Sequence, residues 1–196
     1  MKKTKFSAKK LLFIIILIAF STLIIHSFNN PPHQEQETFQ IKYKDSINKY
    51  CKEYGVDKYL VYAMIKQESN FNNEAVSSAE ARGLMQITED TFNWLKPQLG
   101  ESSTTFEDLF DSDTNIRYGV FFISVLQKNF SEQNTVVAAY NAGMNITTKW
   151  LQDSNYSNDG NTLHNIPYKE TSNYVDVVDY NYKKYLEIYK NVDTNR

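Results

Sequence analysis

The chain has 196 residues, of which 41% are hydrophobic and 14% are aromatic, a composition that excludes wholesale disorder. Its charge is unevenly placed, because residues 1–30 hold five lysines and no acidic residue, which leaves 16 basic and 23 acidic groups in the rest. An acidic globular part lacks the clustered Lys and Arg that bind a phosphate backbone, so we predict no nucleic-acid partner.

The first 28 residues have the pattern of a membrane-targeting segment. Residues 1–10 are basic, and the run from Leu11 to Phe28 is almost wholly apolar. Eighteen residues at a rise of ~1.5 Å span about 27 Å, close to the thickness of a bilayer core. We predict a transmembrane signal anchor over residues 11–28, with residues 1–10 as a cytoplasmic tail and the rest outside the cell membrane. The alternative, a cleaved signal peptide, leads to secretion of the same domain.

Residues 29–44 include Pro31 and Pro32 and read as a polar linker, and residues 191–196 read as a short tail. The chain has one cysteine, Cys51, and its three histidines are scattered at positions 26, 33 and 164. Neither pattern has the spacing of a disulfide framework or a metal site. We therefore predict no cofactor and no metal.

Helical periodicity accounts for most of residues 45–190, the predicted globular domain. Gly55 is a helix stop, and Asp57 and Thr88 are expected N-caps. The helices expected from these signals cover residues 45–54, 58–70, 89–94, 113–127, 133–141, 145–152 and 169–190. Residues 153–165 read as a loop, and the stretch between residues 70 and 86 has no helical period and leaves room for a small hairpin. The predicted fold class is mainly α, a globular helical domain preceded by a transmembrane helix.

Glu68 is the candidate catalytic residue. It closes an apolar helix, just after Ala63-Met64-Ile65. A carboxyl partly surrounded by apolar side chains has a raised pKa, because desolvation disfavours its ionised form. Such a group can protonate a leaving oxygen near neutral pH. Periodicity alone favours the other interpretation, a solvated glutamate near a helix end.

Short sequence segments in a fixed order give Glu68 a context. The first two segments, Gln67–Phe71 and Ala75–Ser77, precede the Gly83-Leu84-Met85-Gln86 run. The later blocks are Ala138–Gly143 and Ile166–Thr171, the last followed by Tyr174-Val175. This ordered set, which spans about residues 45–190, resembles the catalytic domain of the soluble lytic transglycosylases, lysozyme-like enzymes of the goose-type group that cut bacterial peptidoglycan.

The resemblance implies a role for each matched position. Glu68 falls on the catalytic glutamate of the family. The implied substrate-binding residues are Ser77, Met85, Gln86, Tyr140, Asn141, Tyr168, Glu170 and Tyr174. Amide and hydroxyl groups of this kind suit neutral N-acetylated sugars, which offer hydroxyls and acetamides.

Three positions depart from the family pattern. Glu80 stands where the family often has a glycine, so the turn there is expected to differ. Thr88 replaces a second methionine, which removes an apolar contact with the sugar, and Met144 replaces a common proline.

The implied reaction uses one carboxyl group. Most glycosidases use two carboxylates, whereas the resemblance implies that Glu68 acts first as acid and then as base, cleaving the β-1,4 bond between N-acetylmuramic acid and N-acetylglucosamine with a 1,6-anhydromuramyl product. The expected partners are peptidoglycan glycan strands and, through residues 11–28, the cytoplasmic membrane, with the protein as a monomer. A hydrolytic muramidase on the same fold and a non-catalytic protein that binds the cell wall are the alternatives.

Overall fold

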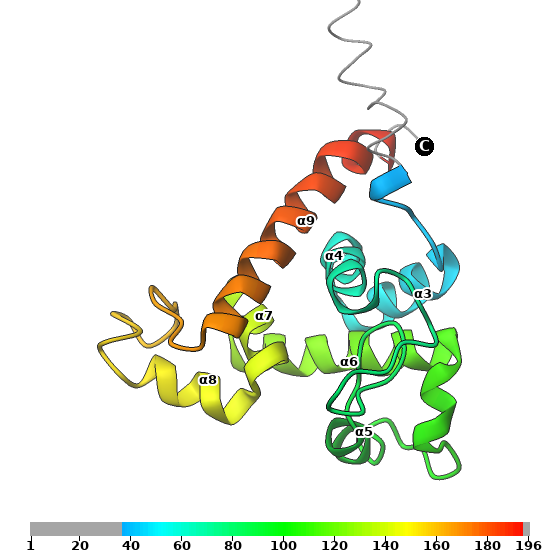
Figure 1. Cartoon of the computed structure of the whole chain (residues 1–196), viewed down its shortest axis with the longest axis horizontal. Helices are drawn as coiled ribbons and strands as arrows, with labels where there is room; N and C mark the ends of the chain where they lie inside the picture. The colour runs from blue at the N-terminus through cyan, green and yellow to red at the C-terminus, as the bar shows by residue number, and fades with distance from the viewer. Residues whose placement is uncertain (1–36, 194–196) are drawn as a thin grey trace, which may run out of the picture. The chain divides into compact units, whose positions relative to one another are not determined.

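A computed structural model describes residues 37–193, with side chains through residue 190 (Figure 1). The predicted tail over residues 1–10, the predicted span over residues 11–28 and most of the linker over residues 29–44 lie outside these residues. Within residues 37–193, no helix has the length and apolarity needed to cross a bilayer. The described residues divide into two compact units, one of residues 41–185 and one of residues 37–40 and 186–193.

The larger unit is built of helices. The described helices are α3 (Lys44–Tyr54), α4 (Lys58–Ser69), α5 (Glu89–Leu95), the 3₁₀ helix η1 (Phe106–Phe110), α6 (Ser112–Asn129), α7 (Gln133–Ala142), α8 (Met144–Leu151) and α9 (Lys169–Asp193). The last helix, α9, runs from the larger unit into the smaller one. The mainly α fold is confirmed, and the expected helices are all present within a few residues of their predicted bounds. The sequence analysis did not predict η1.

Side-chain caps explain where the helices begin. The Asp57 carboxylate accepts a hydrogen bond from the Tyr59 N–H, and the Thr88 hydroxyl accepts one from the Thr91 N–H, as predicted. The start of α6 differs by one residue from the prediction, because Asp111 is the cap and Asp113 lies inside the first turn. The Asp113 carboxylate accepts a hydrogen bond from the Ser46 hydroxyl instead, at 2.7 Å, and so joins α6 to α3.

Two helices organise the core of the larger unit. In α4, seven consecutive residues from Tyr59 to Ile65 are buried, so this helix is apolar on every side, as expected of a central helix. Helix α6 packs against α3, α5, η1 and α7, and Figure 1 shows it running across the unit. Glu68 lies in the last turn of the central helix, where the buried part of α4 ends.

The segment between α4 and α5 is a loop held by isolated bridges. Val76 pairs with Arg82 and Arg82 pairs with Ile87, but no extended strand forms within residues 37–193. The predicted small hairpin is therefore reduced to single bridges. A further bridge, between Ser157 and Leu163, closes the loop that precedes α9.

In the smaller unit, the Tyr189 hydroxyl donates a hydrogen bond to the Phe39 carbonyl at 2.8 Å. Phe39 and Ile188 are both buried. These contacts hold the few residues before α3 against the end of α9.

Candidate active site

The carboxyl group of Glu68 is partly buried and has one hydrogen-bond donor. The Tyr174 hydroxyl, on α9, donates to Glu68 Oε1 at 2.6 Å. Burial raises the pKa of Glu68 from 4.5 to about 7, and the hydrogen bond from Tyr174 opposes this shift. A position at the C-terminal end of a helix also disfavours an anion. Glu68 is therefore able to hold or release a proton near neutral pH.

Two tyrosines stand close enough to Glu68 to sense its charge. Burial raises the pKa of Tyr174 and of Tyr140 well above 10, and the negative charge of Glu68 raises both further. Both phenols therefore remain neutral hydrogen-bond donors over the working pH range of most proteins. The Tyr174 hydroxyl faces the carboxyl, whereas the Tyr140 hydroxyl donates to the Met85 carbonyl at 2.7 Å. Tyr174, one of the predicted substrate-binding residues, is the direct hydrogen-bond partner of Glu68.

The loop between α4 and α5 holds two of the predicted site residues through its own backbone. Gln86 has a left-handed backbone, with φ of 47°, and its amide Nε2 donates to the carbonyls of Ala75 and Gly83 at 3.1 and 2.9 Å. The Ser77 hydroxyl accepts from the Ala79 and Ala81 N–H groups at 3.2 and 3.1 Å. Both side chains thus stabilise the loop. The Gln86 side-chain carbonyl can still accept a hydrogen bond from a ligand, and the Ser77 hydroxyl can still donate one.

Met85 is placed differently from the expectation. Its side chain is fully buried and packs on Gly119 of α6, where a Cβ atom would clash with it. The side chain has no exposed surface to offer a substrate, so its part in the site is structural: it anchors the loop, and its carbonyl accepts from Tyr140.

Asn115 of α6 fixes the same loop, and the sequence analysis missed it. This fully buried side chain donates to the carbonyls of Arg82 and Leu109 at 2.8 and 2.9 Å, and its Oδ1 accepts from the Met85 N–H at 2.8 Å. Its amide also fills the space beside Gly83 so tightly that a Cβ atom would not fit there. The sequence did contain a signal for this residue, because Asn115 is a polar residue next to the apolar stripe of the helix predicted over residues 113–127.

The remaining predicted residues lie on α7, on α9 and just before α9. Asn141 is exposed, and its Oδ1 accepts from the Thr171 hydroxyl at 2.7 Å, which links α7 to α9. Tyr168 is 53% exposed and packs edge-on against Trp150 with ring centroids 5.0 Å apart. Glu170 is exposed in the first turn of α9. The structure therefore brings Glu68, Tyr140 and Tyr174 together most closely.

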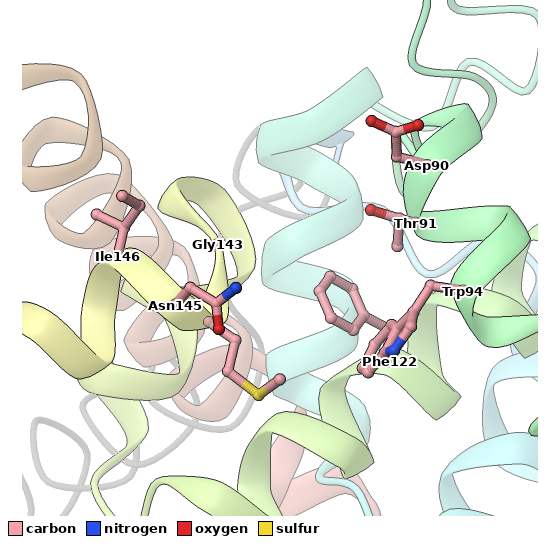
Figure 2. Close-up of a pocket in the computed structure, with 8 residues that line it drawn as sticks. Asp90, Thr91, Trp94, Phe122, Gly143, Asn145 and Ile146 are labelled. Atoms are coloured by element: carbon pink, nitrogen blue, oxygen red, sulfur yellow. The ribbon is translucent and has the colours of Figure 1, made fainter.

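A pocket of about 560 Å³ opens between α5, α6 and α8 (Figure 2). Its wall on α5 includes Asp90, Thr91 and Trp94, and the facing wall on α8 includes Asn145 and Ile146. Phe122 of α6 also lines it, and the Phe122 ring lies 4.9 Å from the Tyr140 ring, centroid to centroid. The pocket thus adjoins the tyrosine that senses Glu68, although Glu68 itself does not line it. The sequence analysis singled out neither Trp94 nor Phe122 as a site residue.

Comparisons with known sequences match most of the larger unit. The family model of the transglycosylase SLT domain matches residues 45–163. Membrane-bound lytic murein transglycosylase C of Sodalis glossinidius (strain morsitans) is 36% identical over 115 residues, which cover 52% of this chain and 31% of that protein. The protein of the same name from Serratia proteamaculans (strain 568) is 33% identical over 114 residues, with the same coverage. The match thus spans about a third of the length of these curated relatives.

Solved structures share the fold. The 70 kDa soluble lytic transglycosylase of Escherichia coli matches with a TM-score of 0.70 and 27% identity, over 78% of this chain and 25% of that chain. An inactive glutamate-to-glutamine mutant of the lytic transglycosylase Slt from Pseudomonas aeruginosa matches with a TM-score of 0.66 and 27% identity, over 76% of this chain and 24% of that chain. Because the family model covers more than half of the chain, the protein belongs to the transglycosylase SLT domain family.

Proposed function

We propose that this protein is a peptidoglycan lytic transglycosylase, in which Glu68 is the only catalytic carboxyl group. The state of the Glu68 carboxyl group carries the proposal. The group is partly buried, its pKa is raised to about 7, and the hydroxyl of the neutral Tyr174 donates to Glu68 Oε1 at 2.6 Å. The named activity of the relatives and the inactivity of the glutamate-to-glutamine mutant of the Pseudomonas neighbour support it.

In the proposed reaction, Glu68 works twice. Protonated Glu68 donates its proton to the oxygen between N-acetylmuramic acid and N-acetylglucosamine, and the bond from that oxygen to the muramyl C1 breaks. The acetamide of the muramyl residue stabilises the positive charge that develops at C1. Ionised Glu68 then accepts the proton of the muramyl C6 hydroxyl as its oxygen bonds to C1, which forms the 1,6-anhydro ring and restores the acid. No water is consumed.

A pKa close to the working pH suits both halves of this cycle, because the same group must give and then recover a proton. Tyr174 keeps the carboxyl oriented, and its hydrogen bond stabilises the ionised form between the two steps. Among the described residues, only burial and Tyr174 shift the pKa of Glu68. A second, electrostatically coupled carboxylate, as used by most glycosidases, is therefore not part of the proposal.

The test is digestion of purified peptidoglycan by the full-length chain in detergent, followed by mass analysis of the released muropeptides. We expect anhydromuramyl ends, which are lighter than the hydrolytic ends by one water. Reducing ends would instead assign the chain as a hydrolytic muramidase.

Glu68→Gln tests the assignment of the acid. We expect a rate loss of roughly 10²–10⁴-fold, the usual contribution of general acid–base catalysis. Glu53→Gln on α3 is the matched control, because Glu53 is exposed and lies outside the site, and it should digest the wall at the wild-type rate. A Glu68→Gln protein that still clears the wall would show that another group is the acid, and a wild type that only binds the wall would point to a non-catalytic protein.

We also propose that residues 11–28 anchor the chain in the cell membrane as a single span, with residues 45–190 on the outer side. The membrane-bound relatives support membrane association, and the apolar run with lysines on one side supports the orientation. Fractionation should recover the chain with membranes, and protease added to spheroplasts should remove the domain. A chain found at mature length in the medium would support the cleaved signal peptide.

A further inference from the structure

The pocket between α5, α6 and α8 has an aromatic floor beside Tyr140. Trp94 is 41% exposed, although it is one of the largest apolar side chains in the protein. It is held edge-on by Phe122, with ring centroids 6.0 Å apart and an angle of 79° between the rings. Phe122 in turn contacts Tyr140. An exposed indole fixed in one orientation at the edge of a pocket of about 560 Å³ has the form of a ligand platform rather than of core packing.

The polar groups of the pocket indicate what such a ligand offers. Asp90 supplies a carboxylate, Thr91 a hydroxyl and Asn145 an amide, and Figure 2 shows these groups on the two facing walls, with Trp94 and Phe122 near them. No Lys or Arg is among the residues that line the pocket. Hydroxyl and acetamide groups can use these acceptors and donors, whereas the carboxylates of a stem peptide would meet Asp90 without a countercharge.

We propose that Trp94, supported from behind by the buried Phe122, stacks on an uncharged N-acetylated sugar of the glycan strand, at a position separate from the sugars at the cleaved bond. The inference rests on the proposed function, because it takes a glycan as the substrate. Phe122 contacts both Trp94 and Tyr140, so the sugar on Trp94 lies near the residues around Glu68. Trp94 then favours long strands over short ones without taking part in the chemistry.

Binding is measured with soluble oligomers of N-acetylglucosamine on the full-length Glu68→Gln protein, so that turnover does not intervene. The chain has two tryptophans, and Trp150 is buried, so a change in indole fluorescence on binding reports mainly on Trp94. Affinity is measured by calorimetry. We expect Trp94→Ala to weaken the binding of the tetramer by roughly tenfold, as for truncation of an aromatic anchor, and Trp94→Phe to weaken it much less.

Tyr180→Ala is the matched control. It removes a 56%-exposed aromatic ring from α9, outside the pocket, and should leave the affinity unchanged. Thermal unfolding of each variant shows whether α5 is intact, and Trp94→Phe keeps the test valid if Trp94→Ala is poorly folded. Unchanged affinity in both Trp94 variants overturns the proposal. So does tighter binding of a free stem peptide than of the sugar oligomer, which would make the pocket a peptide site.

Digestion of the wall separates this inference from the proposed function. If the wild type releases anhydromuramyl products but Trp94→Ala binds oligomers normally, the subsite is wrong and the function stands. If Trp94→Ala loses oligomer binding but the wild type releases no product, the subsite stands and the catalytic proposal fails. When both hold, Trp94→Ala should raise KM for long strands.

Discussion

The proposed catalytic residue, Glu68, is placed against the usual preference of a carboxyl group for water. Glu68 follows seven consecutive buried residues of α4, so the helix itself carries it to the edge of the core. Its neighbours from other helices are the phenol groups of Tyr140 and Tyr174. They stabilise a carboxylate less well than bulk water does, but the Tyr174 hydroxyl donates to one defined oxygen atom. A proton held this way can be given up to a substrate that excludes the remaining water.

Replacement of Tyr174 by phenylalanine should change the pH dependence of the reaction. The Tyr174 hydroxyl stabilises the ionised form of Glu68, so its loss raises the pKa of that carboxyl further. The alkaline limb of kcat/KM, where the acid loses its proton, should therefore move to higher pH, by roughly one unit for one hydrogen bond to a charged group. The measurement is the rate of release of anhydromuropeptides between pH 5 and 9.

The control for Tyr174→Phe is Tyr180→Phe, the same change on the same helix at an exposed position. Its pH profile should match that of the wild type. A limb that moves to lower pH in Tyr174→Phe, or does not move, would mean that Tyr174 does not set the proton affinity of the catalytic group.

At the scale of the elements, the sequence was sufficient for the α-helices and insufficient for η1 and for the loop between α4 and α5. Caps such as Asp57 and Thr88 and the stop at Gly55 are local, so they can be read from a few neighbouring residues. The path of residues 70–87 depends on partners far along the chain. Four of its residues, Asn70, Phe71, Glu80 and Gln86, have positive φ without being glycine.

Glu80 shows what the sequence could not predict about this loop. The sequence comparison marked it as standing in a glycine's place, and the structure gives it a left-handed backbone with φ of 57°, which is a conformation that glycine adopts at lower cost. Nothing in the residue itself predicts this conformation, because residues other than glycine rarely have a positive φ. The same holds for Met85. Its match to a site motif was visible in the sequence, but its burial against Gly119 was not, because that contact depends on α6.

Asn115→Ala should show how strongly α6 holds the loop. The substitution removes three hydrogen bonds and leaves the Met85 N–H and the Leu109 carbonyl without this side-chain partner, whereas the Arg82 carbonyl keeps the Ile87 N–H. Unsatisfied buried groups are costly, so we expect a loss of about 2–5 kcal/mol in the free energy of unfolding. Urea unfolding measures it, with Asn134→Ala on α7 as the control, because Asn134 is exposed. A loss below about 1 kcal/mol would mean that water replaces Asn115 in holding the loop.

The raised pKa of Glu68 lowers the free energy of unfolding of the whole protein at neutral pH. In the unfolded chain this carboxyl has its ordinary pKa of 4.5, and in the fold its pKa is about 7. Between these values the unfolded state has released the proton and the folded state has not, so the folded state binds more protons and stability falls as pH rises. The penalty is absent below about pH 4 and complete above about pH 7, where it amounts to roughly 2–3 kcal/mol for a partly exposed group.

Glu68→Gln should therefore make the protein more stable at pH 8 and leave its stability nearly unchanged at pH 4. Glutamine does not titrate, and its amide oxygen can still accept from Tyr174, so the variant loses the penalty and keeps the contact. The measurement is the difference in the free energy of unfolding between variant and wild type, from urea titrations at pH 4, 6 and 8. Other groups titrate alike in both proteins and cancel in this difference, and Glu53→Gln should show no trend. A difference that stays constant with pH would mean that Glu68 is ionised in the fold at neutral pH, and the catalytic acid would then have to be sought elsewhere.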